Sequence, residues 1–550
     1  MRASRLTSFA DLGTAARVVA RAGLFEPVAP PRLVHVARAL RHWGFTLAGG
    51  FAASAARHPD RLAVVDERGS VTFDALHRRS NALAHGLRSE GFGTDTTIGV
   101  MCRNHAGFVE VTLALAKIGA TGLQCNSGFA GAQLREVVAR EKPAALIFDE
   151  EFTSVVRDGA PELPGFVAWH DGPTSEPTIT SLIRNGSEAD PPRPSQPGRT
   201  IILTSGTTGT PRGAARAQKG SIGPMVALGS VMPLRAGETT VIAAPLFHSW
   251  GFAHLVLALV LGSTVVLRRS FDPVRTLADV GKHRATVLVA VPVMLQRMLD
   301  VPASIRRGFD VSSLRAVVVS GSSLPGGLAT QFMNAFGDVL YNLYGSTEVA
   351  HATLATPEDL RVDPHTAGRP LPHTDVVILD ADDHPVPAGD RGRIFVGNDF
   401  LFGGYTGGGT KATVGRLMST GDVGHFDADG RLSVDGREDD MIVSGGENVY
   451  PEEVEHLLAD HEAIAEVAVV GIDDPQFGQR LKAFVVCQPG ATLTAAEVRA
   501  HVRTHLARHK VPRDVEFTDM LPRNTTGKVL RSQLATPERV SVAEKSKQVG

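Results

Sequence analysis

Residues 204–213 (TSGTTGTPRG) combine small residues with hydroxyl side chains directly after an apolar run. Small residues allow backbone N–H groups to approach phosphate oxygens closely. The hydroxyls of Thr204, Ser205, Thr207 and Thr208 could donate further hydrogen bonds. A Walker A loop is excluded, because no Gly-Lys-Ser/Thr follows at the required spacing. The composition therefore indicates a phosphate-binding loop of another kind, with a flexible Gly/Thr surface loop as the alternative.

Six further motifs follow this run in order. They are APLFHSWG at 244–251, VSGSSLP at 319–325, YGSTE at 344–348, STGDVGHFD at 419–427, GREDDMIVSGGENVYPEEVE at 436–455 and LPRNTTGKVLR at 521–531. Together the motifs resemble those of the adenylate-forming superfamily, which contains acyl-CoA synthetases, peptide-synthetase adenylation domains and luciferases. The resemblance covers about residues 49–534 and is strongest to the fatty-acyl-CoA synthetase-like branch.

The resemblance implies an AMP-forming ligase that uses ATP, Mg²⁺ and coenzyme A. A carboxylic acid would attack ATP to give an acyl-adenylate and pyrophosphate, and the acyl group would then pass to the thiol of coenzyme A. Since negative charge accumulates on the phosphoryl oxygens, catalysis should depend on positioning and on cationic groups.

Most of the residues implied for adenylation surround the nucleotide. Lys528 would bridge the carboxylate and the α-phosphate, Glu348 would bind Mg²⁺, and Thr347 would contact the α-phosphate. Asp422 would accept hydrogen bonds from the ribose hydroxyls. The other residues expected to bind ATP or AMP are Thr204, Ser205, Gly206, Thr207, Thr208, Gly209, Gly321, Ser322, Ser323, Asn342, Tyr344, Gly345 and Arg437. Thr204, Glu348, His248 and Lys528 are the expected catalytic residues.

The resemblance also implies a hinge and a coenzyme A tunnel. Asp439 matches the hinge about which the C-terminal domain turns between the two half-reactions. The residues that match the tunnel are Ser444, Gly445, Gly446, His509 and Lys510. His509 stands where relatives often carry an aromatic residue, and Arg212 stands where most relatives carry lysine, which keeps the charge but changes the hydrogen-bonding geometry.

The acid pocket implied by the resemblance consists of His248, Trp250, Gly321, Gly345 and His351. His248 would gate or position the carboxylate, because an acid that is already ionised at neutral pH needs no catalytic base. A merely packed histidine is the alternative. Trp250 and His351 suit an aryl or medium-chain acid at least as well as a long fatty chain. The identity of the acid therefore stays open.

Other second steps are compatible with the same motifs. The adenylate could pass to a carrier-protein thiol, or the enzyme could activate nitrite for attack by an amine, as diazotases do. A luciferase-like oxygenase and a catalytically silent binding protein are further alternatives, although the intact Lys528, Glu348, Asp422 and Arg437 oppose the last.

The bulk composition narrows the partners. With 550 residues and a formal net charge of −2, the chain has no global field that would attract nucleic acid or an anionic membrane. Its three cysteines are far apart, so we expect a reducing cytoplasm. No segment predicts a membrane span, and the apolar run from His254 to Leu267 predicts a buried helix followed by a buried strand. The oligomeric state, monomer or homodimer, stays open.

The pattern of strands and helices that must position these residues predicts an α/β protein. Alternating strand and helix patterns indicate two doubly wound αβα subdomains, followed by a small β-barrel and a small mobile α+β domain. The expected units are a helical extension at 1–48, an adenylation domain at 49–438, a C-terminal domain at 439–536 and a disordered tail at 537–550. The extension carries seven arginines and two acidic residues, so we expect a helical arm that packs on the body or is partly disordered, with contact to the inner membrane face as the alternative. Residues 171–198 are rich in Pro, Gly and Ser and predict a surface loop.

Overall fold

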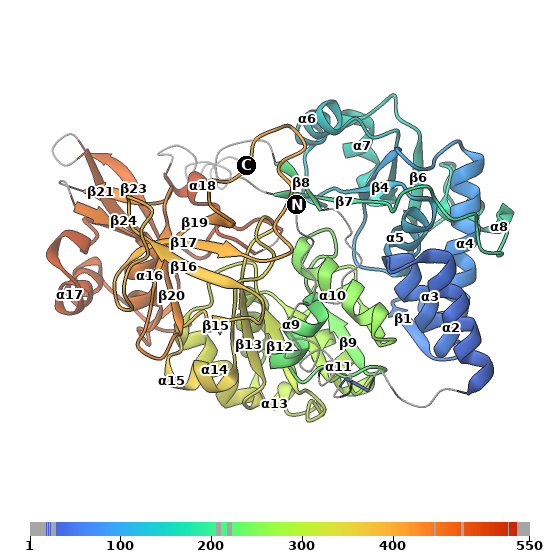
Figure 1. Cartoon of the computed structure of the whole chain (residues 1–550). Coiled ribbons are helices and arrows are strands. Elements are labelled where there is room, and N and C mark those ends of the chain that lie inside the picture. The colour runs from blue at the N-terminus through green and yellow to red at the C-terminus, as the bar shows by residue number, and fades with distance from the viewer. Residues whose placement is uncertain are drawn as a thin grey trace, which may run out of the picture.

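The computed structural model describes residues 18, 20, 22–23, 29–204, 211–216, 223–444, 447–474, 478–525 and 527–535. Two sheets flanked by helices form the larger part of the molecule, and a curled sheet and a smaller domain adjoin them (Figure 1). Within the described ranges, no helix has the length and apolar character needed to cross a membrane.

The first sheet has six strands in the order β6-β5-β3-β4-β7-β8. All neighbours pair in parallel except β7 and β8, which are antiparallel. Its strands are β3 (Thr97–Met101), β4 (Thr121–Gln124), β5 (Ala145–Asp149), β6 (Gly165–Trp169), β7 (Thr200–Thr204) and β8 (Arg212–Arg216). The central strands are short apolar runs buried on both faces, as expected of a parallel sheet covered by helices.

The second sheet has nine strands in the order β15-β14-β13-β12-β11-β9-β10-β1-β2. Its strands are β1 (Leu62–Asp66), β2 (Gly69–Thr72), β9 (Thr239–Ile242), β10 (Thr264–Leu267), β11 (Val287–Ala290), β12 (Ala316–Val319), β13 (Leu340–Tyr344), β14 (Thr353–Ala355) and β15 (Arg369–Pro370). The strands from β1 to β13 along this order are parallel, and the outer strands are antiparallel.

Helices cover these sheets and join them into one core. α5 contacts β4 and β6 of the first sheet and β1 of the second, so it lies between them. The helices and short 3₁₀ helix of this region are α2 (Pro30–Trp43), α3 (Leu47–Arg57), α4 (Phe73–Ser89), α5 (Ala106–Ile118), α6 (Gly131–Glu141), η1 (Glu150–Phe152), α7 (Thr153–Gly159), α8 (Ile179–Asn185), α9 (Gly223–Val231), α10 (Ser249–Val260), α11 (Pro273–Lys282), α12 (Pro292–Asp300), α13 (Ala303–Arg306), α14 (Gly326–Phe336) and α15 (Pro357–Val362).

The prediction of a continuous loop at 171–198 is wrong for its middle part. The Thr178 side chain caps α8 by accepting a hydrogen bond from the Ser181 amide, and two residues of this helix, Ile179 and Leu182, are buried. A short helix is stable here because it packs on α4, a tertiary contact that local composition does not reveal. By contrast, α10 and β10 match the helix and strand predicted for the apolar run that ends at Leu267.

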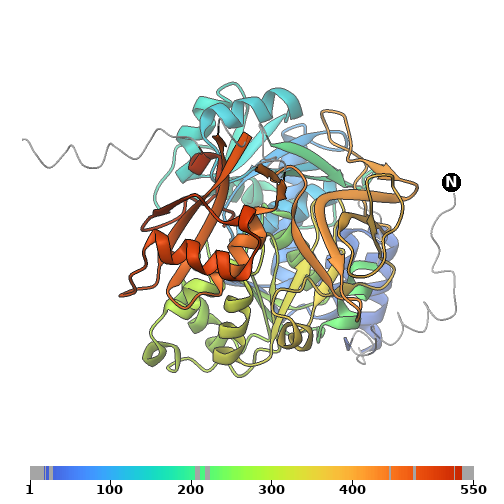
Figure 2. The ribbon, with the colours of Figure 1, turned by 90° about the vertical axis from the view of Figure 1, so that its left-hand side faces the viewer.

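The curled antiparallel sheet contains β16 (Asp375–Leu379), β17 (Gly392–Gly397), β18 (Thr413–Val414), β19 (Leu417–Phe426) and β20 (Leu432–Arg437). The C-terminal part has its own sheet and core. Its elements are β21 (Ile442–Ser444), β22 (Glu447–Val449), α16 (Pro451–Ala459), β23 (Ile464–Asp474), β24 (Gly478–Cys487), α17 (Ala495–His505), the 3₁₀ helix η2 (Arg508–Lys510), β25 (Asp514–Phe517) and α18 (Arg531–Ala535). Figure 2 shows this part in front, between the first sheet's helices above and the second sheet's helices below.

The described part of the N-terminal extension contacts the body. Val18 is buried against Val226 of α9, and the Ala236 amide donates a hydrogen bond to the Ala22 carbonyl oxygen. α2 packs on α3 but leaves Leu33 and Val34 more than half exposed. Residues 1–17 and the tail from 536 onward lie outside the described residues, so the predicted arm and tail are only partly covered.

Candidate active site

Several of the predicted site residues lie at or just beyond the carboxyl ends of parallel strands in the two larger sheets. His248 follows β9, Gly321 follows β12 and Gly345 follows β13, while the glycine-rich run follows β7 of the other sheet. Ligands of open α/β sheets bind outside the carboxyl ends of the strands. Segments from both sheets therefore converge on one side of the molecule, which the C-terminal part faces.

The glycine-rich run joins two antiparallel strands at a sheet edge. Thr204, the last residue of β7, lies opposite Arg212, and its hydroxyl donates to the Arg212 carbonyl oxygen at 3.1 Å. The predicted phosphate ligands Ser205, Gly206, Thr207, Thr208 and Gly209 lie outside the described residues. The Arg212 guanidinium lies 5.6 Å from the centre of the Tyr405 ring. This contact gives a physical reason for arginine here, because a planar guanidinium stacks on an aromatic face better than an ammonium does.

Glu348 and Thr347 follow β13 and are buried. The Tyr405 hydroxyl donates to Glu348 Oε1 at 2.8 Å, and burial together with this carboxylate raises the pKa of the Tyr405 phenol. The carboxylate keeps further lone pairs, since each carboxylate offers about four acceptor sites. The Thr347 and Ser249 hydroxyl oxygens lie 3.3 Å apart. This corner of the site thus offers hard oxygen ligands, which suit a magnesium ion.

Asp422 and Arg437 lie opposite each other on β19 and β20. The Tyr344 hydroxyl donates to Asp422 Oδ2 at 2.6 Å. Burial raises the pKa of Asp422, while the Tyr344 hydrogen bond and the charges of Arg437, Lys528 and Lys411 act in the opposite direction. The Tyr344 hydroxyl group is therefore hydrogen-bonded to Asp422, the residue predicted to bind the ribose.

Lys528 enters this region from the C-terminal part. Burial and the neighbouring Arg437 lower the pKa of the Lys528 ammonium, whereas Asp422 and Glu348 act to raise it. Burial and the Lys528 charge together lower the pKa of His248 to about 4. His248 is therefore neutral at pH 7. These mutual effects mean that Lys528 lies among the residues predicted to bind the nucleotide, although it comes from a different domain.

The predicted acid pocket surrounds the start of α10. His248 caps this helix by accepting a hydrogen bond from the Trp250 amide at 3.4 Å. The Trp250 indole is buried, donates to the Ala290 carbonyl oxygen at 2.9 Å and packs edge-on against the His254 ring. A side chain on Gly345 would lie 2.3 Å from the Ala350 carbonyl oxygen, so only glycine allows this approach.

His351, the other predicted pocket residue, is buried, and its ring lies 5.8 Å from that of Phe400. Its backbone is held by Asn398, whose side-chain amide donates to the His351 carbonyl oxygen at 3.0 Å. Gly345 lies against the same backbone, because a Cβ on it would be 3.0 Å from the His351 Cα. Gly345 and His351 are therefore neighbours, as the prediction requires.

The predicted adenine wall meets the C-terminal part at one residue. Gly321 adopts a φ of 94°, which favours glycine, directly after β12, and Ser322 is half-buried beside it. The Ser323 hydroxyl lies 3.1 Å from His456 Nε2 on α16, so it is engaged between domains. Asn342 lies on β13 next to Val319 of β12, in the same wall.

Of the described hinge and tunnel residues, Asp439 contacts the cluster through Arg437, whereas Ser444, His509 and Lys510 lie in the C-terminal part. Asp439 accepts hydrogen bonds from the Arg437 guanidinium at 2.8 and 3.2 Å. The Lys510 ammonium binds both oxygens of Glu453 at 2.6 and 2.7 Å, within the C-terminal part. His509 and Lys510 lie in η2, which packs beside β22. Ser444 ends β21, whereas Gly445 and Gly446 lie outside the described residues.

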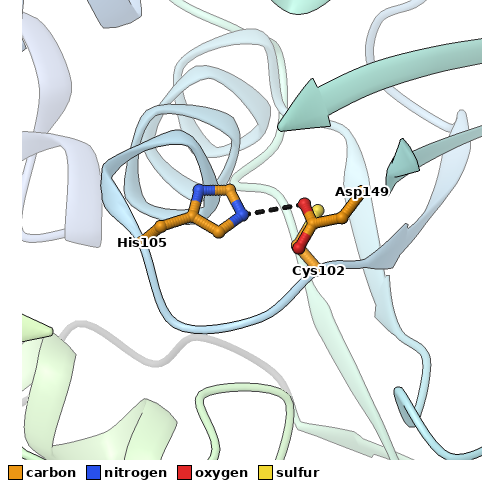
Figure 3. A group of neighbouring side chains, drawn as sticks. All are labelled: Cys102, His105 and Asp149. Atoms are coloured by element: carbon orange, nitrogen blue, oxygen red, sulfur yellow. Dashed lines mark hydrogen bonds and ion pairs between the residues drawn. The ribbon is translucent and has the colours of Figure 1, made fainter. Parts of the chain in front are cut away.

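A separate buried cluster contains Cys102, His105 and Asp149 (Figure 3). His105 Nε2 donates to Asp149 Oδ1 at 2.8 Å, and Asp149 Oδ2 accepts the Arg103 amide at 2.9 Å. Burial raises the pKa of the Cys102 thiol well above its ordinary value, which opposes the thiolate needed for metal binding. Hydrogen bonding thus accounts for this group, which anchors the N-terminus of α5 to β5.

Comparison with known proteins now decides the family. The family model described as AMP-binding enzyme matches residues 51–406, and the model for the AMP-binding enzyme C-terminal domain matches residues 453–528. The chain belongs to the AMP-binding enzyme family. It is thus an AMP-forming, adenylate-forming enzyme of the acid–CoA ligase type, and the predicted family is confirmed.

Characterised relatives of this AMP-binding enzyme act on different acids. Indoleacetate–CoA ligase of Aromatoleum aromaticum (strain DSM 19018 / LMG 30748 / EbN1) is 32% identical over 488 residues, which cover 86% of this chain and 95% of the relative. Feruloyl-CoA synthase of an Amycolatopsis species is 32% identical over 491 residues, covering 86% and 96%. The crystal structure of ATP-bound MatB from Rhodopseudomonas palustris has a TM-score of 0.78 at 26% identity and covers 89% of this chain and 98% of that chain. The predicted fold class is confirmed.

Two residues of the AMP-binding enzyme site were not predicted from its sequence. A Cβ on Gly421 would lie 3.1 Å from Lys411 Nζ, which places this ammonium beside Asp422. Lys411 and Tyr405 both come from the glycine-rich stretch at 403–411, which carries no distinctive motif. In the sequence, the one signal for these two residues was Tyr405, an aromatic residue within a glycine-rich stretch.

Proposed function

We propose that this enzyme converts a carboxylic acid and ATP into an acyl-adenylate and pyrophosphate, and then transfers the acyl group to coenzyme A. The observation that carries the proposal is the position of Lys528. Its charge perturbs His248, and its own pKa responds to Asp422, Glu348 and Arg437. A cation delivered by the C-terminal domain into a nucleotide-binding cleft fits charge stabilisation at a reacting phosphate.

In the first half-reaction, a carboxylate oxygen of the acid attacks the α-phosphorus of ATP. The bond between the α-phosphorus and the bridging oxygen breaks, and pyrophosphate leaves with the electron pair. Lys528 would hold the carboxylate against the α-phosphate, while Thr347 and Arg437 would orient the phosphate and Asp422 the ribose. His248, neutral at pH 7 because its pKa is about 4, would position the acid without transferring a proton.

Glu348 is the proposed Mg²⁺ ligand of this site. The donor set fits, because a buried carboxylate already oriented by the Tyr405 hydroxyl offers further oxygen lone pairs beside Thr347. A bound Mg²⁺ would neutralise charge on the phosphate oxygens. The glycine-rich residues Thr204 to Gly209 would hold the β- and γ-phosphates.

In the second half-reaction, the sulfur of coenzyme A attacks the acyl carbonyl carbon. The bond to the AMP oxygen breaks, AMP leaves with the electron pair, and the thiol proton passes to solvent. We propose that the C-terminal domain turns about Asp439 for this step, so that Ser444, Gly445 and Gly446 line the tunnel. His509 and Lys510 would then meet the nucleotide part of coenzyme A.

The acid is proposed to be an aryl or medium-chain acid. The buried Trp250 indole, which lies two residues beyond His248 and is held by Ala290, would limit the length of an acid bound there. The two relatives named above carry aryl acids in their names, which supports the same class. We further propose residues 49–438 and 439–536 as the two functional domains, a cytoplasmic location, and α2 as the part of the extension that could touch a membrane surface.

Pyrophosphate release across fatty, aryl and small acids, with nitrite included and each with and without coenzyme A, tests the proposal. We expect release with one class of acid and a thioester only when coenzyme A is present. Pyrophosphate release that requires nitrite and an amine would overturn the proposal, and so would release with no thioester. Lys528→Ala is the matched control, because it should abolish pyrophosphate release in a folded protein.

A further inference from the structure

The turn that carries Lys528 contacts the segment that follows β4 of the first sheet through a pair of side chains. The Thr525 hydroxyl donates to Asn126 Oδ1 at 2.7 Å, although the two residues are 399 positions apart in the chain. Asn126 follows β4, and its Oδ1 also accepts the Gly128 amide at 2.9 Å. That local turn fixes the Asn126 side chain in the orientation that meets Thr525.

Two glycines allow this contact to form. A Cβ on Gly128 would lie 2.5 Å from Thr525 Cγ2, so a larger residue would push the two segments apart. On the other side of the turn, a Cβ on Gly527 would lie 2.7 Å from Val293 Cγ1 in the second sheet's region. Gly527 also adopts a φ of 86°, which favours glycine. The turn therefore lies between Gly128, which follows β4 of the first sheet, and Val293 of α12, which belongs to the region of the second sheet.

Hydrogen bonds hold Asn524 and Lys528 together within the C-terminal part. The Lys528 amide donates to Asn524 Oδ1 at 2.9 Å, and the Asn524 amide donates to the Lys528 carbonyl oxygen at 2.9 Å. Arg523 donates to the Gly527 carbonyl oxygen at 2.7 Å and to Glu466 Oε2 at 2.8 Å. Because Thr525 and Lys528 belong to one closed turn, fixing the Thr525 hydroxyl also fixes the start of the Lys528 side chain.

We propose that Asn126 and Thr525 are positioning residues for the adenylation half-reaction. Their hydrogen bond holds the turn where the Lys528 ammonium reaches the acid and the α-phosphate. Any rotation that withdraws Lys528 must break this bond, so the pair acts in adenylation and has no part in thioester formation. The inference rests on the proposed function, since it assigns the half-reaction in which the contact is used.

Half-reaction measurements on Thr525→Val and Asn126→Ala test the proposal. Loss of one neutral, partly accessible hydrogen bond should slow acid-dependent pyrophosphate exchange by roughly three- to tenfold. Thioester formation from a supplied acyl-AMP should stay within twofold of the parent enzyme. Thr525→Ser should restore exchange, because serine keeps the hydroxyl, and the double variant should be no slower than the worse single variant.

Thr518→Val is the matched control. The Thr518 hydroxyl bonds only within the C-terminal part, to the Met520 carbonyl oxygen at 3.1 Å, so its loss should change neither half-reaction. Equal loss of both half-reactions in Thr525→Val, or exchange unchanged within twofold, would overturn the positioning role.

A cross-linking measurement separates this inference from the proposed function. The double variant Asn126→Cys/Thr525→Cys should form a disulfide on mild oxidation, since its two side chains are in contact in the folded enzyme. The oxidised protein should keep pyrophosphate exchange and lose thioester formation, and reduction should restore it. A disulfide in a protein that activates no acid would remove the proposed function but keep the docking contact. Failure to cross-link in a folded, active enzyme would refute the docking itself.

Discussion

The contact between α14 and α16 lets us predict how removing one carboxylate changes the balance between the two half-reactions. Asp460, at the end of α16, accepts the Gly327 amide of α14 at 3.0 Å through Oδ1 and lies 3.0 Å from His365 Nε2 through Oδ2. Both partners belong to the large domain. Asp460→Ala would therefore remove two contacts that hold the C-terminal domain in the orientation with Lys528 in the cleft.

The magnitude follows from the exposure of these groups. The side chains of His365 and Asp460 are 32% and 42% exposed, so solvent screens the pair and limits its contribution to about 0.5–1 kcal/mol. The amide hydrogen bond to the carboxylate adds about 1 kcal/mol. Together they predict that Asp460→Ala shifts the domain equilibrium by about 1.5–2 kcal/mol, roughly ten- to thirtyfold. Asp460→Asn should have a smaller effect, because its amide oxygen can still accept one hydrogen bond.

Single-turnover rates of the two half-reactions measure this shift. Asp460→Ala should slow adenylation by up to roughly thirtyfold and leave thioester formation from supplied acyl-AMP unchanged or faster. Glu462→Ala, at an exposed position just beyond α16, is the control and should behave as the parent enzyme. Equal slowing of both steps, or no change in their ratio, would refute the argument.

The same interface makes adenylation dependent on pH in two opposite ways. The hydrogen bond to Asp460 and the charges of Asp460 and Asp363 raise the pKa of His365. Protonated His365 therefore stabilises the orientation with Lys528 near the nucleotide residues below pH 6.5, and this stabilisation is lost as the pH rises through the raised pKa. Burial, with the nearby His365 and Arg531, lowers the pKa of His456 to about 4. The tendency of His456 to take up a proton below pH 6.5 therefore destabilises the same orientation, in which His456 is neutral. The ratio of adenylation to thiolation should therefore peak just above pH 6.5. A pH profile in which His365→Ala keeps the alkaline decline of this ratio would contradict the assignment.

Two further variants follow from individual contacts. Glu453→Gln removes the carboxylate that holds Lys510, so the KM for coenzyme A should fall by about threefold; a higher KM would show that the ion pair does not compete with coenzyme A. Trp250→Ala removes a buried ring and its hydrogen bond to the Ala290 carbonyl oxygen, so the free energy of unfolding should fall by about 3–5 kcal/mol by thermal or urea denaturation. The enzyme that remains folded should accept longer acids than the Trp250→Phe variant, and identical acid preferences would show that the indole does not limit the pocket.

The sequence predicted the fold because strand and helix periods are local. The buried runs that became β5 and β11 are visible without tertiary information, and the order of the motifs was enough for the resemblance that gave Lys528 its role. The same local reading failed for Ile179 and Leu182 of α8, whose helix depends on packing against α4. The composition of residues 171–198 predicted a loop because their prolines and glycines outnumber their few apolar residues.

Contacts between distant segments were not predictable from the pattern. Nothing in the sequence around Asn126 indicates that it meets Thr525, and nothing around Lys411 indicates that it lies beside Asp422. Such pairs depend on how two domains meet, and neither partner belongs to a spacing that carries chemistry on its own. The predicted roles of the site residues stay predictions until the half-reactions are measured.

The roles proposed for the two lysines of the C-terminal part require that this domain serve one half-reaction at a time. Lys528 lies near Asp422 and Glu348 while Lys510 is bound to Glu453, and α18 and β25 join both segments to the same small sheet. Because these segments move together, a rotation that brings Lys510 toward the cleft must withdraw Lys528. Each orientation is then stabilised by contacts that the other breaks: the Thr525 and Asp460 contacts in the one described here, and coenzyme A in the other. Formation of the acyl-adenylate converts the carboxylate that Lys528 would bind into an uncharged acyl group, so completion of adenylation itself would weaken the first orientation and favour the second.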